Sequence, residues 1–459
     1  MKNLIHLMLA ILLTSTASCT KEFLEKKPNK MLITPSTLAD YWSLLDNREI
    51  MNRTPGMGQL SSDDQFFLYA NYQTQTLAIR NIYTWNKEIY DNTDPGNDWR
   101  TGYNRVFYAN CVLEGLQTIN RTAGNQTEWD NIKGAALFFR AQSFYDLVEI
   151  FGKPYSQTAA TDLGIPLRLS PNLEEISKRA TLQQSYDQVI SDLNSAKNLV
   201  PAVLDSYTAR PAKPAVYALL ARIYLNMGDY TKAENYADSC LAIYNKLLDY
   251  NTLTLSSTAP FGTIEHPEII FQTMTPNSLP LISRANTLID TLLLKSYPTN
   301  DLRPAAFFRT NPAGAYYFKG SYTKFSAPFS GLATDEMYLI RAEGRARRGE
   351  TSLAMQDINL LLSYRFKKNT NGTSTYVNQT AATSKQALDI ILAERRKELV
   401  FRGLRWLDLR RLNREPDRQV TLRRLLNGTE YKLEPNSPLY VFPIPSLEIS
   451  ISGLQQNER

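Results

Sequence analysis

The sequence predicts a mostly α-helical protein, built on helix pairs and joined by long loops with a few short strands. Apolar residues recur at intervals of three and four along several segments, which is the spacing of one helix face. Small and aromatic residues in 213–245 have the spacing of a tetratricopeptide (TPR) helix pair, and the pattern partly recurs in 338–365. Segments rich in Thr, Ser, Pro and Asn lie between these helices and indicate loops.

The first 18 residues have the features of a secretory signal peptide. Lys2 supplies a positive charge, Leu4–Leu13 is almost wholly apolar but too short to span a membrane, and small or short polar residues follow. Cys19 comes directly after them, as in a lipobox, although Thr16 stands where a lipobox usually has leucine. We therefore expect Cys19 to be the lipidated first residue of the mature protein. The alternative is an ordinary signal peptide that is cleaved nearby.

The rest of the chain is expected to form a polar tether over residues 19–35 and then one domain over residues 36–459. Helical spacing begins at Leu38, and 47–75 is loop-like. A turn at 93–98 is expected to place Asp98 as the N-cap of the helix that Trp99 opens.

The next helices have clear stop signals. One is predicted from about Glu128 to Phe151, before Gly152 and Pro154. Thr181 begins another, which ends before Pro201.

The clearest repeat is in the TPR-like segments. Tyr217, Ala221, Gly228 and Ala233 have their counterparts in Tyr338, Ala342, Gly349 and Ala354. Small residues at these positions let two antiparallel helices approach closely, and glycine allows the turn. Residues 134–154 are interpreted as a third, weaker pair.

The remaining segments are expected to be less regular. Residues 246–333 read as long loops with short strands, and 366–384 as a polar loop. Residues 385–413 return to a helical pattern, and the tail from 435 is expected to pack in extended form.

The composition limits the possible chemistry. After removal of the signal peptide His266 is the one histidine left, with Cys111 and Cys240, so zinc sites of the Cys₂His₂ and Cys₄ types are excluded. We expect no cofactor and no metal. Both cysteines lie at apolar helix positions, which favours buried free thiols over a disulfide between them.

The strongest motif is residues 394–411, which we call the hallmark segment. It reads Glu394-Arg395-Arg396-Lys397-Glu398-Leu399-Val400-Phe401-Arg402-Gly403-Leu404-Arg405-Trp406-Leu407-Asp408-Leu409-Arg410-Arg411. It resembles the hallmark of the SusD/RagB family, roughly E-R-R-x-E-L-x-F-E-G-x-R-W-x-D-L-x-R. The family's glutamate before the glycine is replaced by Arg402, which puts any ion pair of that glutamate in doubt.

Weaker matches in the same order extend the resemblance over nearly the whole mature chain. They are Cys19 with Phe23-Leu24-Glu25 and Pro28, Arg140-Ala141, Phe151-Gly152, Gly164-Ile165-Pro166-Leu167, Asp192-Leu193, Glu336-Met337-Tyr338-Leu339 with Ala342-Glu343, Pro443-Ile444-Pro445, and Gln456-Asn457.

The resemblance implies a SusD-like fold and a non-catalytic function. Members of this family are lipoproteins on the outer face of the outer membrane of Bacteroidota, where they cover a SusC-type TonB-dependent barrel. They bind glycans or, in the RagB branch, peptides. The resemblance thus implies a lipid-anchored protein that captures an oligosaccharide and delivers it to such a transporter. Peptide capture is one alternative, and a TPR-like scaffold lipoprotein without a small ligand is another.

The charges of the hallmark segment are mixed, which favours a structural ion-pair network over a ligand-binding arginine cluster. Glu398 and Arg402 are four residues apart and attract, whereas Glu394 and Glu398 repel. Residues 395–424 contain 11 Lys and Arg, but the interspersed acids and the signal peptide argue against nucleic acid.

Catalysis is not expected. His266 precedes a proline in a loop and has no identifiable catalytic partner. The acids Asp63, Asp64, Asp94 and Asp98 are in loops, where acids usually cap turns.

A glycan site needs exposed aromatic rings with polar groups beside them. The resemblance places the ligand surface in early loops and in the region before the last TPR-like pair. The leading candidates there are Tyr317, together with Tyr72 and Trp85, which polar residues flank. The further candidates are Tyr69, Tyr316 and Tyr322, with Asp64, Arg80 and Asn86 as polar partners.

Overall fold

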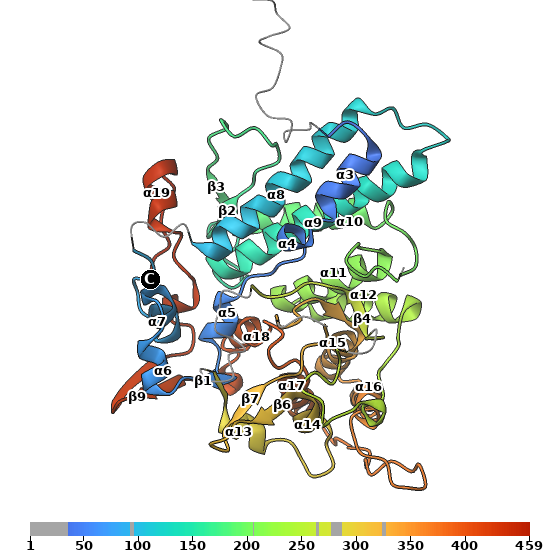
Figure 1. The fold of residues 1–459 in the computed structure, drawn as a ribbon, viewed down its shortest axis with the longest axis vertical. Helices are drawn as coiled ribbons and strands as arrows, with labels where there is room; N and C mark the ends of the chain where they lie inside the picture. Colours follow the sequence, from blue (N-terminus) through green and yellow to red (C-terminus); the bar gives the residue numbers. More distant parts are fainter. Residues whose placement is uncertain (1–34, 92–95, 205, 263–265, 277–286, 324–326) are drawn as a thin grey trace, which may run out of the picture.

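The computed structural model describes residues 35–91, 96–204, 206–262, 266–276, 287–323 and 327–459 (Figure 1). The signal peptide, Cys19, most of the tether and Asp94 lie outside these residues. Within the described ranges no helix combines the length and apolar character needed to cross a membrane.

Helices make up most of the fold. Those of the first half are α3 (Leu38–Leu45), α4 (Arg48–Met51), α5 (Met57–Ser61), α6 (Tyr69–Gln73), α7 (Leu77–Tyr83), α8 (Asn97–Gly115), α9 (Gln126–Phe151), α10 (Leu182–Ala196), α11 (Lys213–Met227) and α12 (Tyr230–Ile243). Those of the second half are α13 (Thr291–Lys295), α14 (Arg303–Phe307), α15 (Thr334–Arg347), α16 (Thr351–Ser363), α17 (Ser384–Glu398), α18 (Arg405–Leu412) and α19 (Ser446–Ser452). Short 3₁₀ turns are η1 (Leu116–Thr118), η2 (Tyr250–Thr252), η3 (Pro416–Arg418) and η4 (Pro438–Tyr440).

The strands form two-stranded antiparallel sheets. The pairs are β1 (Gln65–Phe66) with β5 (Leu288–Ile289), β2 (Leu163–Pro166) with β3 (Arg179–Thr181), β4 (Ile269–Phe271) with β8 (Leu332–Ala333), β6 (Phe308–Thr310) with β7 (Tyr316–Phe318), and β9 (Leu422–Leu426) with β10 (Thr429–Leu433). The predicted fold class, mostly helical with long loops and short strands, is confirmed.

The long helices pack side by side. Helix α9 contacts both α8 and α10, α11 packs on α12, and α12 leads through α15 to α16 and α17 (Figure 1). Local signals fix several of their ends. Thr181 and Gln184 form a capping box at α10, and Gly228 ends α11 with a φ of 81°, a conformation that glycine adopts without strain.

Four expectations about local structure are wrong. Residues 47–75 are not simply a loop, because they contain α4, α5 and α6. Residues 134–154 are no helix pair, because nearly all of them belong to the single helix α9, which packs on α8 and α10 instead. Asp98 does not cap its own helix. Its carboxylate accepts from the backbone N–H groups of Gly56 and Met57, at 3.0 and 2.9 Å, and so anchors the start of α5. The tail is not fully extended, since Ser446–Ser452 forms α19.

Cys111 and Cys240 are both free. Cys240 is buried between α11 and α12, and its thiol donates to the carbonyl of Pro214 at 3.3 Å. Cys111 is half-buried on α8, and burial raises the pKa of its thiol.

Candidate functional site

The hallmark segment forms the end of α17, a tight turn and α18. Phe401 and Gly403 take positive φ angles of 59° and 75°, which reverse the chain between the two helices. The turn directs charged side chains from both helices into the body of the protein.

The acids of α17 are held by arginines from distant segments. Arg303, which is fully buried, donates to Glu394 at 2.7 Å and to Glu398 at 3.1 Å. Arg365 donates to the other oxygen of Glu398 at 2.7 Å and to Glu268 at 2.8 Å. Because one guanidinium lies between them, the two glutamates that repel each other in an isolated helix are both compensated. The predicted structural ion-pair network is confirmed, but Glu398 pairs with these two arginines, and Arg402, its expected partner, pairs with Asp335.

The basic residues of the segment are also paired. Arg395 and Arg411 both donate to Asp408, each at 2.8 Å. Arg411 binds the two oxygens of Glu343 as well, at 2.6 and 2.8 Å. Burial by itself raises the pKa of Glu343, but attraction to Arg411 and hydrogen bonds from it lower that pKa to about 2.

Arg402, the departure from the family motif, has a partner of its own. Its Nη1 donates to Asp335 Oδ2 at 3.0 Å, and its guanidinium lies 4.5 Å from the ring centre of Phe329 and 5.0 Å from that of Tyr322. This protein has Arg402 where the family has a glutamate. The buried carboxylate of Asp335 and the faces of the two aromatic rings, which attract cations, stabilise the guanidinium there.

The hallmark segment reaches directly to the loop that precedes the predicted ligand residues. Arg405 donates to both carboxylate oxygens of Asp63, at 2.7 and 2.9 Å, and Arg396 approaches the same carboxylate at 3.1 Å. The backbone N–H of Gly403 donates to the side chain of Gln59 at 3.1 Å. These contacts fix the end of α5 and the start of β1.

A second support comes from the β9–β10 hairpin. The guanidinium of Arg424 lies 3.5 Å from the ring centre of Tyr83 and 4.6 Å from that of Trp85. The same group donates to the carbonyls of Leu60 and Ser62, at 3.2 and 2.8 Å. Sequence analysis missed Arg424, although a signal was present: it lies between Leu422 and Leu426 on the inward face of an alternating strand.

The candidate residues with exposed side chains lie outside the contact between Arg424 and Tyr83. Tyr69 on α6 is 39% exposed, and Tyr72, one turn later, is half-buried. Their rings are stacked with centres 6.4 Å apart, and Tyr72 packs in turn on the buried ring of Tyr83 at 5.9 Å. Tyr316 begins β7 and is 38% exposed. Tyr69 and Tyr316 are thus partly open to solvent, as a ring that stacks on a sugar must be.

The expected exposure of three other candidates is wrong. Trp85 is 4% exposed, because its indole N–H donates to the carbonyl of Ser61 and Arg424 covers a face. Tyr322 is also buried, between the rings of His266 and Phe329 at 3.8 and 5.5 Å. Tyr317 alternates with Tyr316 on β7 and points inward. Polar neighbours in the sequence did not indicate exposure at these positions.

The polar candidates are divided in the same way. Asn86 is exposed and Arg80 half-buried, whereas Asp64 is buried beside Arg396 at 3.6 Å. Burial raises the pKa of Asp64 to about 6, although Arg396 opposes that shift. Asp64 is thus placed as a support of the loop between α5 and β1.

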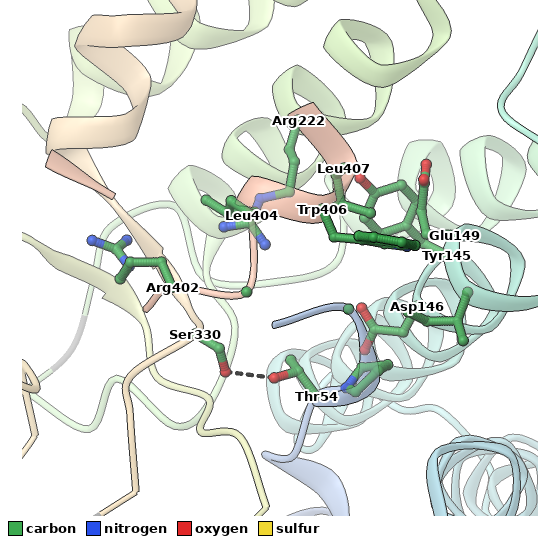
Figure 2. A pocket seen from close by; sticks show the side chains of 14 residues that line it. Thr54, Tyr145, Asp146, Glu149, Arg222, Ser330, Arg402, Leu404, Trp406 and Leu407 are labelled. Atoms are coloured by element: carbon green, nitrogen blue, oxygen red, sulfur yellow. Dashed lines mark hydrogen bonds between the residues drawn. The ribbon is translucent and has the colours of Figure 1, made fainter. Parts of the chain in front are cut away.

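A small cavity of about 40 Å³ lies where α5, α9, α11 and the hallmark turn meet, and Figure 2 shows the side chains that line it. Its polar lining includes Thr54, Tyr145, Asp146, Glu149, Arg222, Ser330 and Arg402. Burial raises the pKa of both Asp146 and Glu149, which Arg105 and Arg410 approach at 2.9 and 3.6 Å. The cavity has room for a few water molecules and is too small for a sugar ring.

One acidic group has the spacing of a metal site. Carboxylate oxygens of Glu268, Asp335 and Glu398 lie within 4.8 Å of one another. Arg365 binds the first and the third, and Arg402 binds the second. The arrangement is that of a charge-balanced ion-pair core, and these residues do not fit a metal ion.

Two family models match the chain. One, described as "Starch-binding associating with outer membrane", matches residues 22–225, and the other, described as "SusD family", matches residues 334–458. The second match includes the whole hallmark segment.

Similar proteins agree with these matches. "SusD-like protein P2" of Formosa agariphila is 31% identical over 136 residues, which cover 29% of this chain and only 25% of that protein. A SusD superfamily protein from Bacteroides thetaiotaomicron has a TM-score of 0.73 at 23% identity, covering 92% of this chain and all of that one. A SusD-like carbohydrate binding protein from Bacteroides vulgatus has a TM-score of 0.68 at 18% identity, covering 91% and 97%. The two structures show that the fold is shared.

Proposed function

Because the chain belongs to the SusD/RagB family, we propose that it is a surface lipoprotein that captures an oligosaccharide and delivers it to a SusC-type TonB-dependent transporter in the outer membrane. The observation that carries the proposal is the pair of neighbouring rings Tyr69 and Tyr72 on α6, of which Tyr69 is 39% exposed and Tyr72 is half-buried against Tyr83. The proposed ligand surface consists of this pair with Tyr316, Arg80 and Asn86.

The geometry suits carbohydrate. A sugar ring presents C–H groups on its faces, and a stacked or tilted row of aromatic rings offers matching apolar area with little side-chain entropy to lose. Tyr72 is held from below by Tyr83, which Arg424 covers, so the platform is preorganised. Trp85 belongs to that support.

A binding screen tests the ligand class. Protein that begins just after Cys19 would be titrated calorimetrically with panels of oligosaccharides and of oligopeptides. The Tyr72→Ala and Tyr69→Ala variants should each weaken binding of the recognised oligosaccharide by about tenfold or more. Tyr207→Ala is the matched control, since Tyr207 is 38% exposed on the loop between α10 and α11, and it should change the affinity little.

Each outcome of the screen has a distinct meaning. Binding of peptides alone would contradict the oligosaccharide proposal and support the RagB-like alternative. Binding of neither class, together with an unchanged fold, would contradict capture and support the TPR-like scaffold.

The proposed anchor and partner need separate tests. A Cys19→Ser variant should lose metabolic labelling with palmitate and leave the outer-membrane fraction. Cross-linking on intact cells, followed by mass spectrometry, should then recover a TonB-dependent barrel with the wild-type protein. Recovery of no barrel would contradict the proposed delivery step while leaving capture standing.

A further inference from the structure

A groove lies along α8, away from the proposed ligand surface. Its volume is about 690 Å³, and it is formed by α8, the segment 166–177 and α19. Figure 1 shows α8, β2, β3 and α19 in the upper part of the molecule and β1 and β7 in the lower part. The groove and the platform on α6 therefore use different elements of the fold.

The walls of the groove are apolar and exposed. Leu173 and Ile176 on one wall are 77% and 85% exposed, and Ile451 on the other is 77% exposed. Phe107 of α8 forms part of the floor and is half-buried. Large apolar side chains gathered on both sides of one groove are typical of an interaction surface.

Two polar groups of the floor are already engaged, whereas the hydroxyl of Ser177, which also lines the groove, has no hydrogen-bond partner among the described residues. The hydroxyl of Tyr103 donates to the carbonyl of Pro166 at 2.8 Å, and the amide of Asn110 donates to the carbonyl of Arg168 at 2.9 Å. These groups hold the wall 166–170 against α8 and leave mainly carbon surface for an occupant. Such a floor suits aliphatic side chains better than sugar hydroxyls, which need free hydrogen-bonding groups.

The rim of the groove carries acidic groups. Among the described residues, Glu174, Glu175 and Glu448 form no ion pair. Arg168 uses its guanidinium on the carbonyls of Asn172 and Glu175, within its own loop. Arg100 also lines the groove and is exposed, and its guanidinium donates to the side chain of Asn97 at 3.2 Å. The three carboxylates outnumber this exposed guanidinium, so the charge of the rim favours a basic partner.

We propose that this groove is a docking surface for a segment of a partner protein that presents apolar side chains flanked by basic residues. The apolar side chains would lie between Ile176 and Ile451, and the basic ones would pair with the rim carboxylates. An adjoining hollow of about 300 Å³, which shares Asn110 and Ser170 with the groove, lets the segment continue towards Trp129. The inference is independent of the proposed oligosaccharide function.

Two dye-labelled synthetic peptides test it by fluorescence anisotropy on the full mature chain. Both have twelve residues, with leucine and isoleucine at the same positions. All remaining positions are lysine in one peptide and glutamate in the other. The lysine peptide should bind, and the Ile176→Asp/Ile451→Asp variant should weaken that binding by about tenfold or more. Both substituted side chains are exposed, so the variant should keep the fold and the wild-type melting temperature.

Two further variants separate the contributions. Glu174→Lys/Glu175→Lys should weaken binding of the lysine peptide and strengthen binding of the glutamate peptide. Val377→Asp is the matched control, because Val377 is 81% exposed on another loop and should leave the affinity unchanged.

Several outcomes would overturn the proposal. They are absence of binding by the lysine peptide, equal binding of the two peptides, and binding that the paired aspartates leave intact. Self-association of the wild-type chain in sedimentation experiments, abolished by the same aspartates, would identify a second copy as the occupant instead.

Discussion

Arg405 and Asp63 form a two-point ion pair, with N–O distances of 2.7 and 2.9 Å, between the first turn of α18 and the loop before β1. The pair joins the hallmark segment to the part of the chain that carries the proposed platform. The hallmark segment is thus a structural anchor of the early loops, through Asp63 and Gln59. Arg424 of β9 adds a second anchor, because it donates to the carbonyls of Leu60 and Ser62.

Asp63→Asn should lower the free energy of unfolding by about 2 kcal/mol, because it leaves Arg405 and Arg396 without their shared charge partner. Urea denaturation followed by circular dichroism measures this change. Asp389→Asn is the control: Asp389 also meets two basic groups, but its side chain is 48% exposed, and the loss should stay within about 0.5 kcal/mol. Equal losses in the two variants would show that Asp63 is not an anchor.

Restoring the glutamate of the family motif should harm this protein. Arg402→Glu would place a second carboxylate beside buried Asp335 and remove the cation from the faces of Phe329 and Tyr322. We expect a loss of about 3–5 kcal/mol, the usual cost of an uncompensated buried charge. Calorimetric melting curves of the wild type, Arg402→Glu and Arg402→Gln would rank the three, with glutamate the least stable. A glutamate variant as stable as the wild type would disprove the pairing.

Stability should fall in acid partly through Glu343. Its pKa is about 2 in the folded protein, so the unfolded chain binds its proton more readily between pH 2 and the ordinary glutamate range. Its contribution, of order 3 kcal/mol, is therefore fully present near neutral pH and is lost as the pH falls towards 2. Urea titrations at pH 5, 4 and 3 should show a shallower decline for Glu343→Gln than for the wild type. An unchanged slope would contradict the lowered pKa.

The main effect of Trp85→Ala should be a loss of stability. Removing a buried indole that packs under Arg424 should cost about 3–5 kcal/mol. Trp85→Phe keeps most of the apolar volume and should cost clearly less. Melting temperatures measure both losses. An alanine variant that melts with the wild type would place Trp85 at the surface, contrary to the structure.

Much of the fold could be predicted from local sequence signals. Thr181 indicated the start of α10, Gly228 the end of α11, and the interleaved charges of 394–411 an ion-pair network. Each of these features depends on neighbours within a few residues.

The residues that pair with the hallmark segment could not be predicted from the sequence. Arg303 meets Glu394 and Glu398 across 91 and 95 positions, and no local pattern distinguishes it from other arginines. The exposure of aromatic side chains could not be predicted from their sequence neighbours either. Trp85 has polar neighbours in the sequence and Tyr69 has apolar ones, yet Trp85 is covered by Arg424 from the far end of the chain and Tyr69 is 39% exposed.

The contact of Arg424 with the carbonyl of Leu60 spans 364 positions and has a consequence for the order of folding. The N-terminal loops are synthesised first, but the hairpin that covers Tyr83 and Trp85 is among the last parts to emerge from the ribosome. Long-range contacts of this kind form slowly, because a large loop must close before they contribute. A nascent chain therefore keeps its early aromatic residues uncovered until synthesis is nearly complete, and that interval is when a chaperone would protect it from aggregation.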